Sequence, residues 1–193
     1  MNACNTCLPK EQARSRPGGC ACAPGGPAEA RRRLTLGLAA AALLVPALPR
    51  VGHSAPAQPG EPVSWPTVSL LDGERWGPGQ AAGRAMVVVF WSTTCPFCLR
   101  HNAHIEKLRR AAAGRALGIL TVCRDRDPAV VAAYLSRHGY GFPVTLEHAA
   151  MAAALSARKV IPLSVLVVLS GRLQQVIAGE MFEEDVMQWL QLA

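Results

Sequence analysis

Two cysteines separated by two residues, Cys95 and Cys98, lie where an apolar segment gives way to a segment with helical spacing. The run Met-Val-Val-Val-Phe-Trp over residues 86–91 predicts a buried strand, and the pattern from Pro96 onward predicts a helix. Pro96 suits the first helical position, because its missing N–H and fixed φ carry no penalty there. Cys95 is therefore expected to cap the helix, and the apolar face of the helix is predicted to consist of Leu99, Ala103, Ile105, Leu108 and Ala112.

The N-terminus of a helix stabilises negative charge, because unpaired N–H groups and the positive end of the helix dipole lie there. In such a position the pKa of a cysteine falls from about 8.5 to roughly 3.5–7.5. We therefore expect Cys95 to be largely ionised near neutral pH and to attack disulfides. Cys98 lies one helical turn further on, where it can displace a partner that Cys95 has captured. The spacing thus predicts a redox-active pair with Cys98 as the resolving thiol.

Zinc binding is the alternative for this motif. Four-ligand zinc sites usually carry a second Cys-x-x-Cys or a His-x-x-x-His pair, and neither pattern occurs beyond residue 55. His101 and His104 follow the cysteines, but four such side chains on one helix cannot easily reach one ion. The absence of Cys-x-x-Cys-His excludes covalent haem attachment by this motif. We therefore expect neither a metal site nor a cofactor.

The N-terminal part of the chain has the layout of an export signal. Three arginines at residues 31–33 precede an apolar stretch over 34–45, and small and polar residues follow. The arginines also resemble a twin-arginine signal. We predict a leader over 1–55, with an uncleaved membrane anchor as the alternative, a Pro-rich linker over 56–66 and a single domain over 67–193. Export would place this domain in the oxidising periplasm, where disulfides persist.

The formal net charge of +7 is concentrated in the predicted leader. The first 55 residues hold seven of the 20 Lys and Arg and two of the 13 Asp and Glu, which leaves 13 cations against 11 carboxylates for the remainder. Basic nucleic-acid binders gather their charge on one face or stripe, whereas the arginines from Arg84 to Arg172 are scattered among acids. We therefore expect no nucleic-acid partner.

Five further cysteines lie outside the pair. Cys123 ends a predicted strand over 118–122, where a buried, inert cysteine is the commoner case and a redox role is the alternative. The other four belong to a segment too rich in Pro, Gly and Ala to form a core: Cys4, Cys7, Cys20 and Cys22. We expect these four to belong to a discarded leader or to precede a later start codon, and metal binding is their alternative.

The rest of the chain alternates between strand and helix patterns. A short strand over 67–71 is followed by a βαβ unit over 86–122. The next helix is predicted to begin at Pro128, with Asp127 as N-cap, and to end at Gly139. Its buried stripe is predicted to comprise Val130, Val131, Tyr134 and Leu135. The remaining elements are expected to be a strand near Val144, a helix over 149–155, a hairpin over 165–177 and a last helix from Glu183, with Val186, Trp189 and Leu190 facing inward.

Pro162 stands immediately before the first strand of that hairpin, where a proline is normally unfavourable. A cis bond between Ile161 and Pro162 would cost only about 0.5–1 kcal/mol. It would turn the chain sharply and leave the backbone of Ile161 free to pair with an extended partner. A trans proline that starts a strand fits the local sequence equally well.

Together these features resemble the thioredoxin fold, and more narrowly the exported TlpA/ResA branch of thiol-disulfide oxidoreductases. The resemblance runs from Val63 to Leu192 and is carried by residues 87–92, the cysteine pair, 142–144, 161–162 and 179–181. It implies an α/β fold with a central mixed sheet flanked by helices, in which a ββα unit follows the βαβ unit. It also implies that Cys95 is the nucleophile, Cys98 the resolving thiol and Pro162 a cis-proline facing the disulfide. Substrate contacts are expected from Trp91, Thr94, Pro96, Phe97 and Ile161.

Three positions depart from the pattern of this branch. Thr94 replaces a frequent Trp before the first cysteine, and Val89 stands where cytoplasmic thioredoxins keep a buried aspartate. His101 occupies the place of a buried acid that is thought to move protons to the resolving thiol. By spacing, His101 lies one turn beyond Cys98, and its usual pKa near 6.5 suits a base. Our hypothesis is that His101 replaces the acid as base, and a solvated helix histidine is the alternative.

The direction of electron flow is the last expectation. The dipeptide between the cysteines, Pro96-Phe97, resembles the Pro-Tyr of glutaredoxins and does not fix the redox potential by itself. The resemblance implies a reductant of protein disulfides, for example in apocytochrome c or copper-site proteins, supplied by a membrane electron donor. A protein-disulfide oxidant is one alternative. A copper-binding chaperone is another, although such proteins usually separate their two cysteines by three residues and add a distant histidine.

Overall fold

The computed structural model describes residues 55–192, so the predicted leader lies outside the described residues except for Ala55. The strands are β1 (Val68–Ser69), β2 (Arg75–Trp76), β3 (Ala85–Trp91), β4 (Leu117–Cys123), β5 (Val144–Thr145), β6 (Leu163–Val167) and β7 (Leu173–Ala178). The helices are α1 (Pro78–Ala81), α2 (Pro96–Ala111), α3 (Pro128–His138), α4 (His148–Leu155) and α5 (Glu183–Gln188), and a 3₁₀ turn follows over Trp189–Leu192. Within residues 55–192, no helix is both long and apolar enough to cross a membrane.

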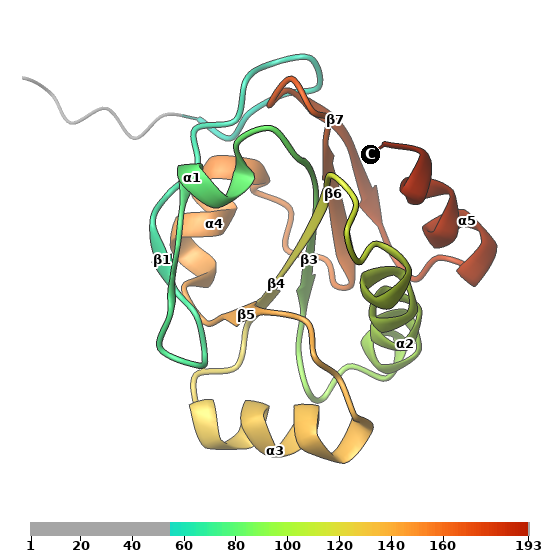
Figure 1. Ribbon diagram of the computed structural model, residues 1–193. Helices are drawn as coiled ribbons and strands as arrows, with labels where there is room; N and C mark the ends of the chain where they lie inside the picture. The colour runs from blue at the N-terminus through green and yellow to red at the C-terminus, as the bar shows by residue number, and fades with distance from the viewer. Residues whose placement is uncertain (1–54, 193) are drawn as a thin grey trace, which may run out of the picture. The chain divides into compact units, whose positions relative to one another are not determined.

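A five-stranded mixed sheet in the order β5-β4-β3-β6-β7 forms the centre of the domain (Figure 1). β3, β4 and β5 run parallel, whereas β6 and β7 are antiparallel to their neighbours. The expected α/β fold with a βαβ unit followed by a ββα unit is therefore confirmed. β1 and β2 form a separate two-stranded sheet.

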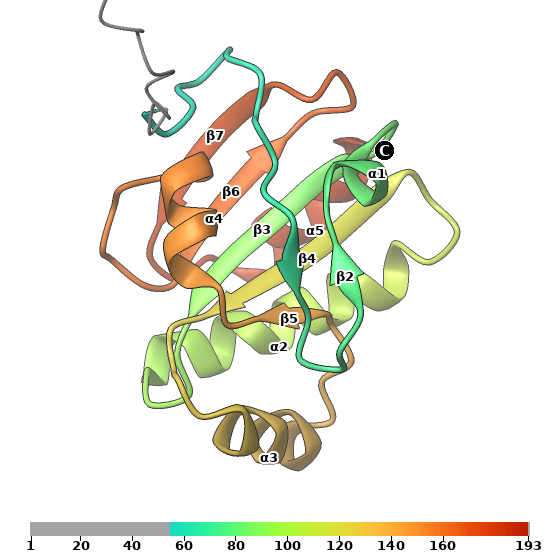
Figure 2. The same cartoon turned by 90° about the vertical axis from the view of Figure 1, so that its left-hand side faces the viewer.

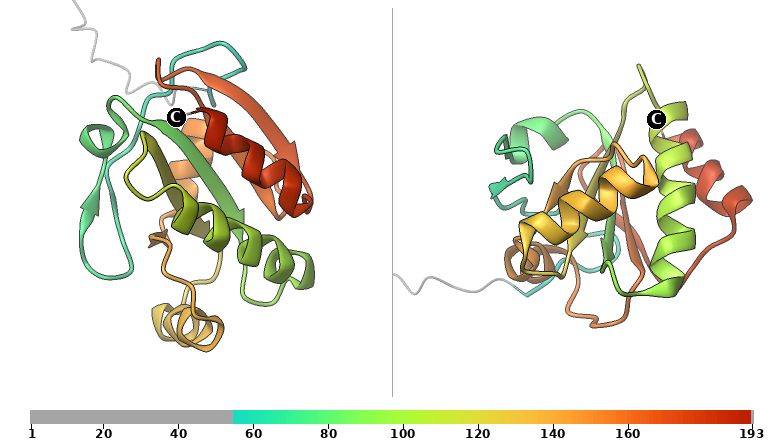
Figure 3. Two further views of the ribbon diagram at one scale, coloured as in Figure 1. Left: turned by 45° about the vertical axis from the view of Figure 1, so that its right-hand side comes forward. Right: turned by 90° about the horizontal axis from the view of Figure 1, so that it is seen from below.

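The sheet is covered on both faces because β3 and β4, which are buried along their whole length, alternate their side chains between two cores. One face packs against α2 and α5, as Figure 3 shows, with a core that includes Val87, Val89, Ile105 and Trp189. The opposite face packs against α4 and the β1–β2 hairpin, as Figure 2 shows, with a core that includes Val88, Phe90, Met151 and Trp76. The central strand thus positions the loop that follows it between two packed layers.

Two predicted helix faces need correction. Leu99 is 38% exposed, and the buried residues of α2 are Cys98, His101, Asn102, Ile105, Glu106 and Leu108. On α3, Val131 and Tyr134 are buried, whereas Val130 is 48% exposed. In each helix the predicted buried face contained an apolar residue that directly neighbours a buried one. A step of one residue rotates the side chain by about 100° around the helix axis, which turns Leu99 and Val130 toward solvent.

The predicted ends of α3 are confirmed. The Asp127 side chain accepts a hydrogen bond from the Ala129 N–H at 2.9 Å and caps the helix. Gly139 ends α3 with φ of 66°, a left-handed conformation that favours glycine. The hairpin also forms, but its first strand, β6, begins at Leu163, directly after Pro162.

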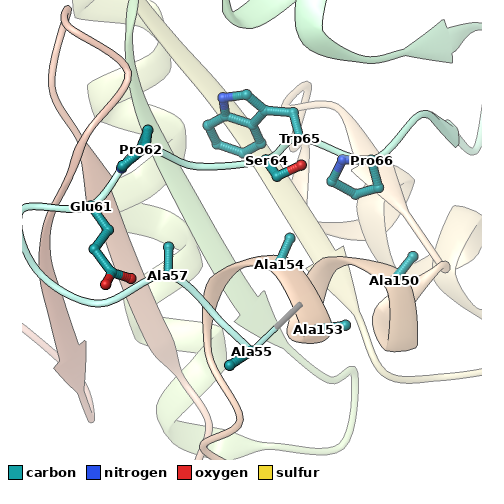
Figure 4. A pocket seen from close by; sticks show the side chains of 10 residues that line it. All are labelled: Ala55, Ala57, Glu61, Pro62, Ser64, Trp65, Pro66, Ala150, Ala153 and Ala154. Carbon is teal, nitrogen blue, oxygen red and sulfur yellow. The ribbon is translucent and has the colours of Figure 1, made fainter. Parts of the chain in front are cut away.

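Residues 56–66, assigned to a linker from the sequence, are hydrogen-bonded to the domain. Gly60 N donates to Leu173 O at 2.7 Å, Val63 N to Gly171 O at 2.9 Å and Ala57 N to Ala154 O at 3.1 Å. Between this segment and α4 lies a surface hollow of about 470 Å³ (Figure 4). Among its lining residues Glu61 is the sole ionisable side chain. The hollow therefore contains no cysteine or histidine, and the cysteine pair lies in another part of the domain.

Candidate active site

Cys95 and Cys98 form a disulfide at the N-terminus of α2, with their Cα atoms 5.2 Å apart. Cys95 is the N-cap, with φ of −90° and ψ of 113°, and Pro96 occupies the first turn as expected. The Cys98 N–H donates to the Cys95 sulfur at 3.2 Å. No acidic residue lies in the first turn of α2, so nothing there opposes the positive end of the helix dipole. The predicted local geometry for stabilising a Cys95 thiolate is therefore present.

The two sulfurs differ in their access to solvent. Cys95 is half-buried at the surface, whereas Cys98 is fully buried on the inward face of α2. An attack from outside thus reaches Cys95 first. This difference allows one sulfur to exchange with a partner while the other is kept beneath it.

The loop before Cys95 is held by Asp125, which sequence reasoning missed. The Asp125 carboxylate accepts hydrogen bonds from Thr93 N at 2.7 Å and from Ser92 Oγ at 3.3 Å. Ser92 Oγ in turn accepts from Thr94 N at 3.3 Å. Burial raises the pKa of Asp125, but its hydrogen bonds with Thr93, Cys123 and Ser92 outweigh burial, so that the pKa is lowered overall and the side chain stays ionised. Asp125 therefore anchors the segment from which the nucleophile projects.

Pro162 lies at the same end of the sheet as the cysteine pair. The Ile161–Pro162 peptide bond is cis, as the resemblance implied. Leu163, the next residue, is the antiparallel partner of Phe90 near the end of β3. Gly179 N donates to Pro162 O at 2.8 Å and joins this turn to the end of β7. Pro162 is buried and Ile161 is half-buried beside it.

His101 is fully buried, so the alternative of a solvated helix histidine is wrong. Its Nε2 is 3.0 Å from Ser164 Oγ, and its Nδ1 accepts from Met181 N at 3.4 Å. Burial and, secondarily, the charge of His104 lower the pKa of His101, whereas the charge of Glu180 raises it. The pKa is lowered overall to about 4. His101 is therefore neutral near pH 7, with its proton on Nε2 because Nδ1 accepts from Met181 N. The bond from Met181 N must break before Nδ1 can take a proton from Cys98.

The residues expected to contact substrate do not all reach the surface. Thr94 and Pro96 are exposed, and Phe97 is 55% exposed with the Arg100 guanidinium 5.2 Å from its ring centroid. Trp91 is fully buried against Tyr134 and Phe142, so the expectation that Trp91 contacts substrate is wrong. Trp91 is the last residue of a central strand, where both faces are covered, and this explains its burial.

Cys123 is buried and carries no disulfide. Its Sγ donates to Asp125 Oδ2 at 3.4 Å, and burial raises the pKa of the Cys123 thiol to about 12. The expected buried cysteine is confirmed, and its protonated thiol is a poor nucleophile.

The histidines near the pair do not turn toward a common ion. His104 Nδ1 lies 3.2 Å from Met181 O, and the ring of His101 is occupied as described above. Across residues 55–192, no group of three or more His, Cys, Asp or Glu side chains is arranged to hold a metal ion.

Comparison with known proteins agrees with this geometry. The sequence pattern of the Redoxin family matches residues 58–189. The thiol-disulfide oxidoreductase ResA of Halalkalibacterium halodurans is 25% identical over 122 residues, which cover 63% of this chain and 69% of that protein. The ResA of Geobacillus thermodenitrificans is 23% identical over 124 residues, covering 64% of this chain and 71% of that protein.

Solved structures share the fold. StoA from Bacillus subtilis superimposes with a TM-score of 0.57 at 21% identity, over 68% of this chain and 98% of StoA. A thiol:disulfide interchange protein from Chlorobium tepidum superimposes with a TM-score of 0.62 at 24% identity, over 72% of this chain and 99% of that protein. At identities this low, the similarity establishes a shared fold, which is the thioredoxin-like architecture.

Proposed function

The chain belongs to the Redoxin family and is a thiol-disulfide oxidoreductase, and from this premise we propose that it is an exported reductant of protein disulfides that acts through Cys95 and Cys98. The observation that carries the proposal is the asymmetry of the pair. Cys95 caps α2 at the surface and accepts the Cys98 N–H, while Cys98 lies buried one turn away. Cys95 is accordingly the nucleophile and Cys98 the resolving thiol.

The proposed reaction has two exchange steps. In the reduced protein the Cys95 thiolate attacks one sulfur of a substrate disulfide, the substrate S–S bond breaks, and the other substrate sulfur leaves as a thiolate that takes up a proton. Cys98 then loses its proton and attacks Cys95 Sγ in the mixed disulfide. The Cys95–Cys98 disulfide forms, and the second substrate sulfur leaves as a thiolate that also takes up a proton. Two electrons have passed from the pair to the substrate, and the two substrate thiols have taken up two protons, one from Cys98 and one from water.

Several side chains support these steps. We assign the receiving surface to Thr94, Pro96 and Phe97, which are exposed around Cys95. Pro162 faces the disulfide in this proposal, and the backbone of Ile161 pairs with an extended substrate segment. The base that takes the Cys98 proton is assigned to His101, whose Nδ1 becomes free to accept it when the hydrogen bond from Met181 N opens during the reaction.

The direction and partners follow from the family resemblance. Substrates are proteins with cysteines or disulfides, such as apocytochrome c or copper-site proteins in the periplasm. A membrane electron donor of the thiol-disulfide interchange type restores the reduced pair. The predicted leader supports export, either as a cleaved signal or as an anchor in the inner membrane.

The redox potential tests the direction. Equilibration of the pair with glutathione buffers, followed by separation of the oxidised and reduced forms, should give a potential below about −220 mV, toward the thioredoxin value of about −270 mV. A Cys123→Ala variant should give the same potential, because Cys123 is outside the exchanging pair. A potential near that of strong oxidants, about −120 mV, would assign the protein to disulfide formation instead.

A further inference from the structure

Two pairs of exposed cations, more than 30 residues apart in the sequence, lie on two neighbouring loops. Arg124 and Arg126 lie in the β4–α3 loop, and Arg158 and Lys159 lie in the α4–β6 loop. Arg124 Nη1 donates to the backbone carbonyl of Lys159 at 2.9 Å and ties the two loops together. We call these four residues the basic rim.

The basic rim borders the cysteine pair. Arg124 N donates to Trp91 O at 2.9 Å, so the β4–α3 loop runs beside the segment that leads into Cys95. The α4–β6 loop continues from Lys159 directly into the Ile161–Pro162 turn. Figure 2 shows both loops at the end of the sheet where β3 finishes and β6 begins. A substrate segment bound at the cysteine pair would therefore lie beside the basic rim.

The basic rim carries an excess of positive charge. Within residues 55–192 no salt bridge involves the rim, because the ion pairs all use cations of α2, namely Arg100, Lys107, Arg109 and Arg110. The two carboxylates of the β4–α3 loop, Asp125 and Asp127, accept from Thr93 N and Ala129 N, and their negative charges offset part of the charge of the rim. The α4–β6 loop holds no acidic residue, so the two loops together carry four cations against two carboxylates.

A surface hollow of about 530 Å³ opens between the β4–α3 loop and α4, lined in part by Arg124 and Arg126. Two carboxylates also line it: Glu147, which accepts from Ser69 N at 2.6 Å, and Asp125, which accepts from Thr93 N. Burial, and secondarily the charge of Arg124, lowers the pKa of His148 in the same hollow. An acidic side chain at the hollow would meet two guanidinium groups and these two carboxylates, so the net attraction comes from the other two cations of the rim, Arg158 and Lys159.

We propose that the basic rim docks an acidic segment of the protein substrate beside Cys95, so that disulfides flanked by Asp and Glu are preferred. This inference rests on the proposed function and names the class of substrate for the same site. Charge complementarity of this kind raises the rate of association by about 10- to 1,000-fold at low salt.

Two peptides of equal length test the proposal, each with one internal disulfide, flanked in one by Glu and in the other by Lys. The reduced full chain is mixed with each at low salt, and the second-order rate constants of reduction are compared. The test variant is R126Q/R158Q/K159Q. The control variant is R84Q/R115Q/R137Q, which removes the same charge from exposed positions outside the rim. Arg84 and Arg115 precede β3 and β4, at the opposite end of the sheet.

We expect wild type and the control variant to reduce the acidic peptide at least about 10 times faster than the lysine peptide. In the test variant this ratio should fall to within about twofold of one. The ratio should also approach one for wild type in about 1 M salt, where the Debye length is about 3 Å.

Each contrary outcome has a distinct meaning. If wild type reduces both peptides at equal rates, the docking proposal is overturned and the proposed function stands. If wild type reduces neither peptide nor a small neutral disulfide, the proposed function itself is overturned. Binding to phosphatidylglycerol vesicles that is lost in the test variant, without any preference between the peptides, would assign the rim to a membrane surface and also overturn the proposal.

Discussion

Replacing Cys95 by Ser should lower the rate of disulfide exchange by about 10³-fold or more, because a serine hydroxyl is not ionised at neutral pH and cannot replace a thiolate. The fold should remain, since Cys95 is half-buried at a helix terminus and its oxygen replacement can still accept the Cys98 N–H. The measurement is the rate at which the reduced variant cleaves a protein disulfide, with circular dichroism as the check on folding.

Replacing Cys98 by Ser should have a different effect. Cys95 can still attack a substrate disulfide, but nothing resolves the product, so a mixed disulfide accumulates in stoichiometric amount. Mass spectrometry of the trapped species should place the substrate on Cys95. A Cys123→Ser variant serves as control and should turn over normally, because its thiol is buried and protonated. If the substrate is trapped on Cys98 in a Cys95→Ser variant instead, the assigned roles are reversed.

The second large effect concerns His101 and acid. The pKa of His101 is lowered from 6.5 to about 4 in the folded protein, chiefly by burial. Between these two values the unfolded chain binds a proton that the folded chain excludes, so the free energy of unfolding falls as the pH is lowered. From pH 7 to pH 5 this single residue should remove about 2 kcal/mol of stability.

Urea unfolding at a series of pH values measures this loss. A His101→Asn variant should have a flatter pH profile than wild type in this interval, even if the substitution lowers stability at pH 7 through the partners it leaves at Ser164 and Met181. His138→Asn, which removes a histidine from an exposed position, is the matched control. His148 is present in all three proteins and contributes equally to the pH dependence of their free energies of unfolding. Identical pH profiles for the two variants would show that His101 is not the residue whose protonation is prevented by folding.

The positions that sequence predicted correctly depend on short-range rules. Cys95 and Pro96 at the start of α2, and Asp127 and Gly139 at the ends of α3, are fixed by cap chemistry that involves residues within one turn. The βαβ unit and the hairpin were predicted because each is built from elements that are adjacent in the sequence. These signals are readable in a single sequence.

What sequence missed depends on neighbours that are distant along the chain. Asp125 meets Thr93 because the loops after two adjacent parallel strands leave the sheet together, and the polarity of the loop at 92–94 was the one available signal. The family resemblance implied a substrate contact for Trp91, yet Tyr134 of α3 packs against its ring and Trp91 is fully buried. The basic rim joins cations more than 30 residues apart, so their spacing in the sequence concealed the cluster.

The central claim is that the end of α2 holds the Cys95 sulfur as a thiolate. Its most direct test is the ultraviolet thiolate absorbance of the reduced protein as a function of pH, with Cys98→Ser and Cys123→Ala substitutions present so that Cys95 is the one described cysteine that titrates. A pKa below about 7.5, with a rate of alkylation that follows the same curve, is the result predicted here. A pKa of about 8.5, as in a free cysteine, would contradict the account.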